Sequence, residues 1–435
     1  GKNNVTFLGQ SRNGAIISFP NNANFQAANG GTTHARMNFK VNANDIVLDT
    51  LTISNSTPQG GSQAEALMIE SGARRCIVIN SEIDSRQDTI LANVNSSQAY
   101  FYKSLIKGNF DYIWGGGNLF FDQCEIRTIA GSSSFNLTAA RTDTSATQSA
   151  SFPWANPGGT YTANGMSFVN CTFTADPGVG AVTLAGSNGT AGNNVSWYGC
   201  NFATNYVAPS ASLFSGNFVF WQNANTSNGV PVTYPVVTPI GVTNNDPRLL
   251  AATNPPTWFY GWTPQLAPSI VTPPAGATFT AGETATLTVG ATGIPDPVYQ
   301  WLQNGTNAPY PTANSATLVI SNVQPADAGT YSVVVANSIG AVMSSPATLT
   351  VITPTPPVMQ TNSVRSLGSG GGVQFSFGGT PGADYRVWAT TNIALTPVIG
   401  GWDLVGSGTF GAGPATFTDL QATNFPQRFY TITSP

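Results

Sequence analysis

Two aspartates and two glutamines recur at intervals that could bring them together. They lie in three short motifs, Gln63-Ala-Glu-Ala-Leu67, Gln87-Asp-Thr-Ile90 and Asp111-Tyr-Ile-Trp-Gly115. Asp88 and Asp111 are 23 residues apart, and Gln63 precedes Gln87 by 24 residues. Each interval is about one turn of a parallel β-helix, in which equivalent residues of successive turns stack. We therefore expect these four side chains on one patch of one face.

Such a set could hydrolyse an ester without histidine or metal. Two carboxyl groups in unlike surroundings can divide into a nucleophile and a general acid. Glutamine amides can donate hydrogen bonds to a developing oxyanion. The alternative is that Asp, Asn and Gln simply occupy turns, where these residue types are common. Spacing alone leaves both interpretations open.

The composition excludes several other chemistries. The chain has one histidine in 435 residues, so a metal site built from several histidines is impossible. A Ser-His-Asp site could rest only on His34, which lies in a polar stretch that we interpret as a loop. The four cysteines form no Cys-x-x-Cys pair. We expect neither a bound metal nor a cofactor.

A repeat in the first part of the chain predicts the elements that position these residues. Short apolar runs end in a polar residue, a small residue, any residue, and then Ile or Phe. The small residues are Ser81, Ser104, Cys124, Cys171 and Cys200. Their spacings of 23, 20, 47 and 29 residues fit turns of a parallel β-helix, with 47 as one turn carrying a long insertion or as two turns.

We expect these small residues to form one inward column. Adjacent rungs of a parallel sheet lie about 4.8 Å apart, which a disulfide accepts. A disulfide between two of the three column cysteines and an unbonded cysteine ladder therefore both remain open. Cys76 lies outside the column.

The chain is predicted to be all-β, with three domains. Residues 1–265 form the right-handed parallel β-helix, residues 266–352 an immunoglobulin-like sandwich, and residues 358–435 a second small β-sandwich. In the middle domain, Trp301 and Tyr331 match the buried strand Trp and the corner Tyr of immunoglobulin sandwiches. Val333 stands where the second cysteine would be, so we expect aliphatic packing in place of the disulfide. This module resembles bacterial I-set-like immunoglobulin domains.

Charge and hydropathy exclude other partners. Only 8% of the residues are charged and the net charge is −4, which gives no electrostatic reason to bind nucleic acid or anionic membranes. The sequence has no run of about 18 apolar residues, the length that a helix needs to span a bilayer. The polar, Lys-poor composition favours a secreted, extracellular protein, and the resemblance to bacterial I-set-like domains implies a bacterial one.

In this order and spacing, the three motifs resemble the pectinesterase family, the pectin methylesterases. The family pattern reads Gln-Ala-x-Ala-Leu, Gln-Asp-Thr-Leu and Asp-Phe-Ile-Phe-Gly, and the resemblance covers about residues 1–265. It implies a right-handed parallel β-helix acting on methylated polygalacturonate, a pectin-like polysaccharide. By position, Asp111 would attack the ester carbonyl, and Asp88 would protonate the leaving methanol and then activate water. Gln87, helped by Gln63, would stabilise the anionic intermediate. The substrate-binding residues would be Trp114 and Arg141.

Two departures from the family bear on activity. Members carry a Leu-Gly-Arg-Pro-Trp motif some 70 residues after the nucleophile, whereas residues 181–189 here contain neither Arg nor Trp. An Arg partner typically lowers an Asp pKa by about 1–3 units. We therefore expect activity to rise with pH as Asp111 ionises, and Arg141 is the nearest candidate substitute. The family's opening turns, with their Gly-x-Tyr-x-Glu motif, are missing as well.

The missing turns suggest a second class of function. A β-helix without its end cap exposes unpaired backbone groups, which invite stacking on another chain and head-to-tail self-association. The alternative is therefore a catalytically degenerate β-helix that serves as an extracellular fibre-forming, adhesive or carbohydrate-binding subunit. The retained aspartate pair favours the enzyme.

Overall fold

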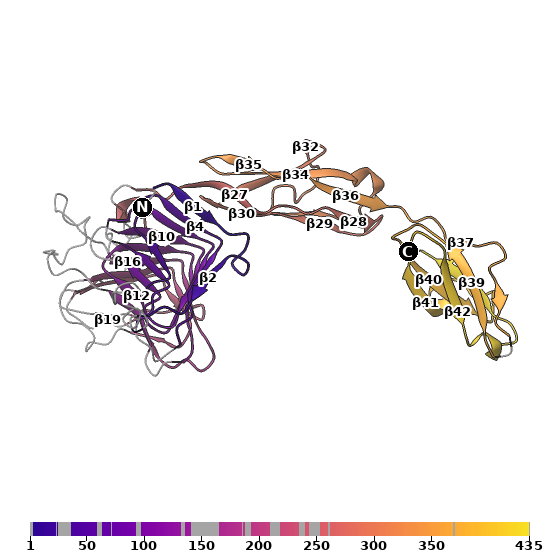
Figure 1. Ribbon diagram of the computed structural model, residues 1–435, viewed down its shortest axis with the longest axis horizontal. Helices are drawn as coiled ribbons and strands as arrows, with labels where there is room; N and C mark the ends of the chain where they lie inside the picture. Colours follow the sequence, from indigo (N-terminus) through magenta and orange to yellow (C-terminus); the bar gives the residue numbers. More distant parts are fainter. Residues whose placement is uncertain are drawn as a thin grey trace. The chain divides into compact units, whose positions relative to one another are not determined.

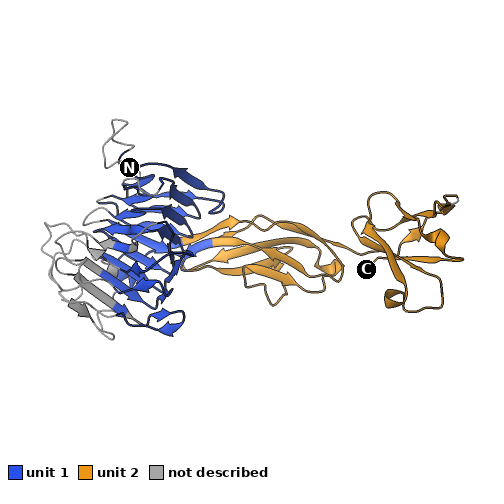
Figure 2. Ribbon diagram, turned by 90° about the horizontal axis from the view of Figure 1, so that it is seen from below, with its two compact units in different colours: residues 1–266, 292–295 blue, residues 267–291, 296–435 orange. Residues whose placement is uncertain are grey.

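Short apolar strands separated by sharp corners wind the first part of the chain into a parallel β-helix. We describe a computed structural model over residues 3–22, 24, 36–58, 63–70, 72–92, 97–131, 135–140, 165–184, 186–187, 193–208, 218–234, 240–242, 253–259, 262–368 and 370–434. The chain divides into two compact units (Figure 2). Unit 1 comprises Gly1–Leu266 with Thr292–Pro295, and unit 2 comprises Ala267–Ala291 with Asp296–Pro435.

Unit 1 consists of three sheets, A, B and C, in which strands from successive turns of the chain lie side by side. Figure 1 shows these successive turns. Sheet A has the order β1 (Val5–Leu8), β4 (Ile46–Asp49), β7 (Cys76–Ile79), β10 (Gln98–Tyr102), β13 (Asn118–Asp122), β16 (Gly165–Val169), β20 (Asn193–Tyr198), β23 (Phe218–Asn223) and β26 (Ile240–Val242). Sheet B has the order β2 (Ile16–Phe19), β5 (Thr52–Asn55), β8 (Glu82–Ser85), β11 (Leu105–Gly108), β14 (Glu125–Thr128), β17 (Thr172–Ala175), β21 (Asn201–Phe202), β24 (Thr226–Ser227) and β25 (Val230–Pro231).

Sheet C contains two of the predicted site residues, Asp111 and Trp114, in one strand. Its order is β22 (Tyr206–Val207), β18 (Val182–Thr183), β15 (Phe135–Ala140), β12 (Phe110–Gly115), β9 (Ile90–Ala92), β6 (Leu67–Ile69) and β3 (Phe39–Val41), with β19 (Gly186–Ser187) paired to β15. Neighbouring strands of all three sheets pair in parallel, except β24 with β25, which are antiparallel. These sheets confirm the predicted parallel β-helix.

The predicted inward column is confirmed. The apolar residue two positions after each column member pairs in register with its counterpart on the next turn of sheet B. These residues are Ile83, Ile106, Ile126, Phe173 and Phe202. The column cysteines are almost completely buried in the core. All four cysteines are free, so the unbonded ladder is correct and the disulfide alternative is wrong. Strand β14 pairs directly with β17, so the interval of 47 residues is one turn with an insertion.

The residue before each column member makes the corner between sheets A and B. These corner residues all have a φ angle between 47° and 62°. They are Asn80, Lys103, Gln123, Asn170 and Gly199. This left-handed region disfavours most side chains and favours glycine and asparagine. The corner turns every rung at the same place and thereby keeps successive turns in register.

Aromatic side chains fill the interior of the helix. Phe101, Phe121 and Phe168 stack on successive turns with ring centroids 4.6 Å apart. A second apolar cluster covers the outer face of sheet A, where Phe259 packs after the short helix α3 (Pro255–Trp258). Ile294, from the short segment that belongs to unit 1, joins this cluster. Among the described residues, no helix has the length and hydropathy to cross a membrane.

Unit 2 contains two further β-modules, each with its own core. The first comprises β27 (Leu266–Thr272), β28 (Ala277–Thr280), β29 (Ala285–Thr288), β30 (Gly290–Ile294), β31 (Val298–Gln303), β32 (Thr306–Asn307), β33 (Thr317–Ile320), a 3₁₀ turn (Pro325–Asp327), β34 (Gly329–Ala336), β35 (Ala341–Met343) and β36 (Ala347–Ile352). Of these strands, Leu266 in β27 and Thr292–Ile294 in β30 belong to unit 1. The second comprises β37 (Val358–Met359), β38 (Arg365–Ser366), β39 (Val373–Gly378), β40 (Asp384–Thr390), α4 (Val398–Gly401), β41 (Asp403–Thr409), β42 (Ala415–Asp419), a 3₁₀ turn (Ala422–Asn424) and β43 (Phe429–Thr433).

The immunoglobulin landmarks lie as predicted. Trp301 and Val333 are fully buried and pair across β31 and β34. The hydroxyl of Tyr331 donates to the backbone oxygen of Asp327 at 2.7 Å, which makes the tyrosine corner. Apolar packing around Trp301 therefore replaces the disulfide.

Candidate active site

The register of sheet C brings Asp88 and Asp111 to equivalent positions on adjacent turns. Gln87 forms a parallel bridge with Phe110, and the Asp88 amide donates to the Phe110 carbonyl at 3.3 Å. Asp88 and Asp111, which follow these two residues, are therefore neighbours across the sheet. The stacking expected from their spacing is confirmed, and the charge of Asp111 is close enough to raise the pKa of Asp88.

Backbone irregularity at both aspartates sets their side chains apart from the regular strand. Asp88 has φ 56° and Asp111 has φ 45°, both in the left-handed region. The pairing of β12 with β15 shifts between Phe110 and Ile113, so a bulge lies at Asp111. Bulges bend a strand and redirect a side chain, and they are frequent beside active sites. The sequence motifs did not predict this bulge.

The two carboxyl groups have unlike surroundings. Asp88 is 3% exposed, and its Oδ2 atom is buried without a hydrogen-bond partner in the described part of the chain. Burial, then the negative charges of Glu65 and Asp111, raise the pKa of Asp88 to about 8. Asp111 is only half-buried. At neutral pH, Asp88 therefore holds a proton that it can donate.

The two glutamines lie beside Asp88. Gln63 contributes a side-chain hydrogen bond to Asp88, and Gln87 directly precedes Asp88 in the chain. The paired strands β6 and β9 begin at Leu67 and Ile90, so both glutamines lie in the segments that lead into these strands.

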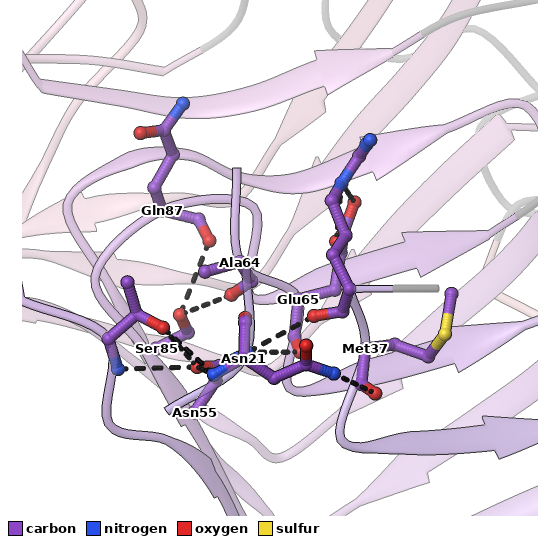
Figure 3. Close-up of polar contacts among 9 residues, drawn as sticks. Asn21, Met37, Asn55, Ala64, Glu65, Ser85 and Gln87 are labelled. Carbon is purple, nitrogen blue, oxygen red and sulfur yellow. Dashed lines mark hydrogen bonds and ion pairs between the residues drawn. The ribbon is translucent and has the colours of Figure 1, made fainter. Parts of the chain in front are cut away.

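Gln87 is held through its backbone, which leaves its side chain free to reach outward. The Ser85 hydroxyl donates to the carbonyls of Ala64, at 2.6 Å, and Gln87, at 3.3 Å. Figure 3 shows the Gln87 amide pointing away from the buried polar network around Asn55. Half-buried and beside Asp88, this amide can serve as a hydrogen-bond donor.

A buried ion pair beside Asp88 was missed by the sequence analysis. Arg36 donates from Nε to Oε1 and Oε2 of Glu65 at 2.8 Å each, and Glu65 is completely buried. Glu65 is the central residue of the first motif, where a carboxylate between two alanines could have indicated a cationic partner. Nothing in the spacing identifies that partner as Arg36.

Trp114 lies three residues beyond Asp111 and is mostly buried. It is 8% exposed and packs with Met68 and Leu91, its register neighbours on sheet C. The Arg36 guanidinium lies 5.9 Å from its ring centroid. Little of this ring can meet a ligand, and its predicted substrate-binding role stays a prediction.

Other predicted residues lie outside the described part of the chain. Arg141 and His34 are among them, as is Asn188, the second residue of the pair Ser187-Asn188 that stands where the family's Arg-Pro would fall. The preceding Ser187 lies in β19 and pairs with Ala140 of sheet C. The described residues contain no cluster of His, Cys, Asp and Glu that could hold a metal ion.

Comparisons with known proteins agree with the motif analysis. Residues 1–181 match the family model described as pectinesterase, and residues 267–337 match the one described as immunoglobulin domain. The chain is 30% identical over 142 residues to a pectinesterase of Ralstonia nicotianae, covering 31% of this chain and 33% of that protein. It is 28% identical over 131 residues to Pectinesterase 31 of Arabidopsis thaliana, covering 29% and 40%.

Each alignment spans less than half the length of these curated relatives. Among solved structures, a pectin methylesterase from Yersinia enterocolitica is similar, with 20% identity, a TM-score of 0.48, and coverage of 60% of this chain and 89% of that one. The resemblance of the N-terminal part to the pectinesterase family is thus confirmed by the family model and by the curated relatives.

Proposed function

We propose that the protein is a secreted carboxylic ester hydrolase that removes methyl groups from methylated polygalacturonate. The observation that carries the proposal is the adjacency of Asp88 and Asp111 on sheet C, with one carboxyl group buried and the other half-exposed. The match of residues 1–181 to the pectinesterase family supports the same substrate class.

In the proposed first step, a carboxylate oxygen of Asp111 attacks the ester carbonyl carbon. The carbonyl electrons move to oxygen, and the amides of Gln87 and Gln63 donate hydrogen bonds to that oxyanion. The intermediate collapses by breaking the bond to the methoxy oxygen, which takes the proton of Asp88 and leaves as methanol. A mixed anhydride joins the substrate acyl group to Asp111.

In the second step, the Asp88 carboxylate accepts a proton from water, whose oxygen attacks the acyl carbon. The bond between the acyl carbon and the Asp111 oxygen breaks, which regenerates the Asp111 carboxylate and leaves Asp88 protonated. The sugar is released as the carboxylic acid, which then gives its proton to solvent. Asp88 must therefore carry a proton before the first step and have lost it before the second. A carboxyl group with a pKa of about 8 can both donate and accept a proton near neutral pH.

Methanol release from methylated polygalacturonate tests this proposal. We expect Asp111→Asn to lower the rate by about 10³-fold or more, because the nucleophile is lost. Asp88→Asn removes the proton donor and should lower it by about 10²–10⁴-fold. Asp84→Asn is the matched control, since Asp84 lies in β8 on sheet B and should leave the rate unchanged. Equal rates for the natural protein and Asp111→Asn would overturn the proposal.

That outcome would favour the alternative, a catalytically degenerate extracellular fibre-forming, adhesive or carbohydrate-binding subunit. Head-to-tail self-association is the property that separates it from the enzyme. Electron microscopy of the purified protein tests for such fibres directly.

A further inference from the structure

A buried pair of opposite charges lies next to the two aspartates. Arg36 and Glu65 are joined by two hydrogen bonds, and their side chains are 10% and 0% exposed. We propose that Arg36 and Glu65 are a positioning pair that keeps the shared proton of the site on Asp88, so that Asp111 remains the nucleophile. This inference deepens the proposed function and rests on it.

The first argument is the register. Glu65 lies two residues before strand β6, Asp88 lies two residues before strand β9, which pairs with β6, and Asp111 follows the bridge of Gln87 with Phe110 on the next turn. The carboxylates of Glu65 and Asp111, from the turns before and after that of Asp88, both act on Asp88. Like charges close together cannot all ionise, and the group in the middle of a buried row is the one whose ionisation costs most. Among the described residues, the charged side chains acting on Asp88 are Glu65, Asp111 and Arg36, and Glu65 has the largest effect.

The second argument is that the backbone holds the pair in place. Asn55 is buried, and its Nδ2 donates to the carbonyls of Arg36, at 3.3 Å, and Glu65, at 2.9 Å. Its Oδ1 accepts from the amides of Asn21 and Thr57, at 3.2 Å each (Figure 3). Because Asn55 fixes both backbones, the charge of Glu65 stays beside Asp88.

A second ion pair on the same turns is much more exposed to solvent and serves as a comparison. Lys40 in β3 pairs with Glu70, which follows β6, and their side chains are 45% and 24% exposed. Exposed pairs contribute little because water screens them. An ion pair as deep as Arg36–Glu65 gains little stability over apolar side chains. Stability alone is therefore a weak reason for it.

The test replaces the pair by two apolar side chains, Arg36→Met with Glu65→Met. Neutralising both partners leaves no unpaired buried charge, and such replacements usually fold. The control is Lys40→Gln with Glu70→Gln. The measurement is the pH dependence of kcat/KM for methanol release from methylated polygalacturonate.

We expect the alkaline limb of the natural profile to fall as Asp88 loses its proton. In Arg36→Met/Glu65→Met that limb should move to lower pH, because Glu65 affects Asp88 more than Arg36 does. We also expect kcat to fall about tenfold with little change in KM, as for a group that acts on the chemical step. The control should change neither. A limb that stays in place would overturn the proposal.

A second readout does not depend on activity. The unfolding free energy is measured against pH for each protein with and without Asp88→Asn, and the difference reports the proton on Asp88. We expect its midpoint to be lower in Arg36→Met/Glu65→Met than in the natural protein, and an unchanged midpoint would contradict the inference. If the Met variant does not fold, Arg36→Gln with Glu65→Gln gives the same test. If the natural protein releases no methanol, the proposed function fails, while this measurement still decides the role of the pair.

Discussion

The surroundings of Asp88 differ strongly from those of a surface carboxyl group. Its pKa in the folded protein is about 8, against about 3.9 for an unfolded chain. The folded state therefore keeps a proton that the unfolded state releases between these two values. Stability from this group is fully present below pH 4 and is lost as the pH rises towards 8.

This sign gives a residue-scale prediction. Between pH 5 and pH 8 the natural protein should lose on the order of 1 kcal/mol of unfolding free energy per pH unit through Asp88. Asp88→Asn cannot ionise, so its stability should fall less steeply over the same range. Denaturant unfolding at several pH values measures both slopes. Parallel slopes would show that Asp88 does not hold the proton.

The sequence predicted the adjacency of the aspartates but not their protonation. Their spacing equals one turn, so stacking followed once the repeat was recognised. Arg36 was missed because it lies outside the three motifs, and a single arginine has no recurring spacing that would mark it.

At the scale of the strand and its corner, the repeat predicted more than the individual side chains did. The inward column of small residues correctly predicted which position of its turns points into the core, and it predicted the strands of sheet B that follow. It did not reveal that the preceding residue adopts a left-handed conformation. The repeat also did not predict the bulge at Asp111, because the bulge is a shift in the pairing register between strands β12 and β15.

The corners can be tested with two opposite substitutions. Gln123 has φ 54°, so Gln123→Gly should remove backbone strain and raise the unfolding free energy by up to about 1 kcal/mol. Gly199 has φ 62°, and a Cβ there would lie 2.4 Å from Oδ1 of Asn170. Gly199→Ala should therefore lower the unfolding free energy by about 1–3 kcal/mol. Thermal unfolding of both variants measures these changes, and equal changes of one sign would contradict this account of the corner.

At the scale of the whole molecule, every residue assigned to the site belongs to unit 1. The module beginning at β37 has its own core around Phe375 and Phe377. Residues 353–357 lie between strands β36 and β37. The sequence predicted these strands well, because period-two alternation is a strong local signal.

Removing residues 358–435 should therefore leave the rate on short, soluble methylated oligogalacturonates within about twofold of that of the full chain. Calorimetry should show the loss of one unfolding transition, because a module with its own core unfolds separately. A large loss of activity would mean that the terminal module supports the site. A loss confined to insoluble polysaccharide would instead assign that module to binding.

The most direct test of the central claim is to locate the covalent bond. An activated ester of galacturonate, whose leaving group needs no proton, should acylate Asp111 even in Asp88→Asn, where the water step is slow. Quenching with hydroxylamine converts the mixed anhydride at the enzyme carboxyl to a hydroxamate, which peptide mass spectrometry can assign. We predict the modification on Asp111, and its absence from Asp111→Asn/Asp88→Asn. Turnover by the natural protein without modification of Asp111, or with modification of another carboxylate, would contradict the account.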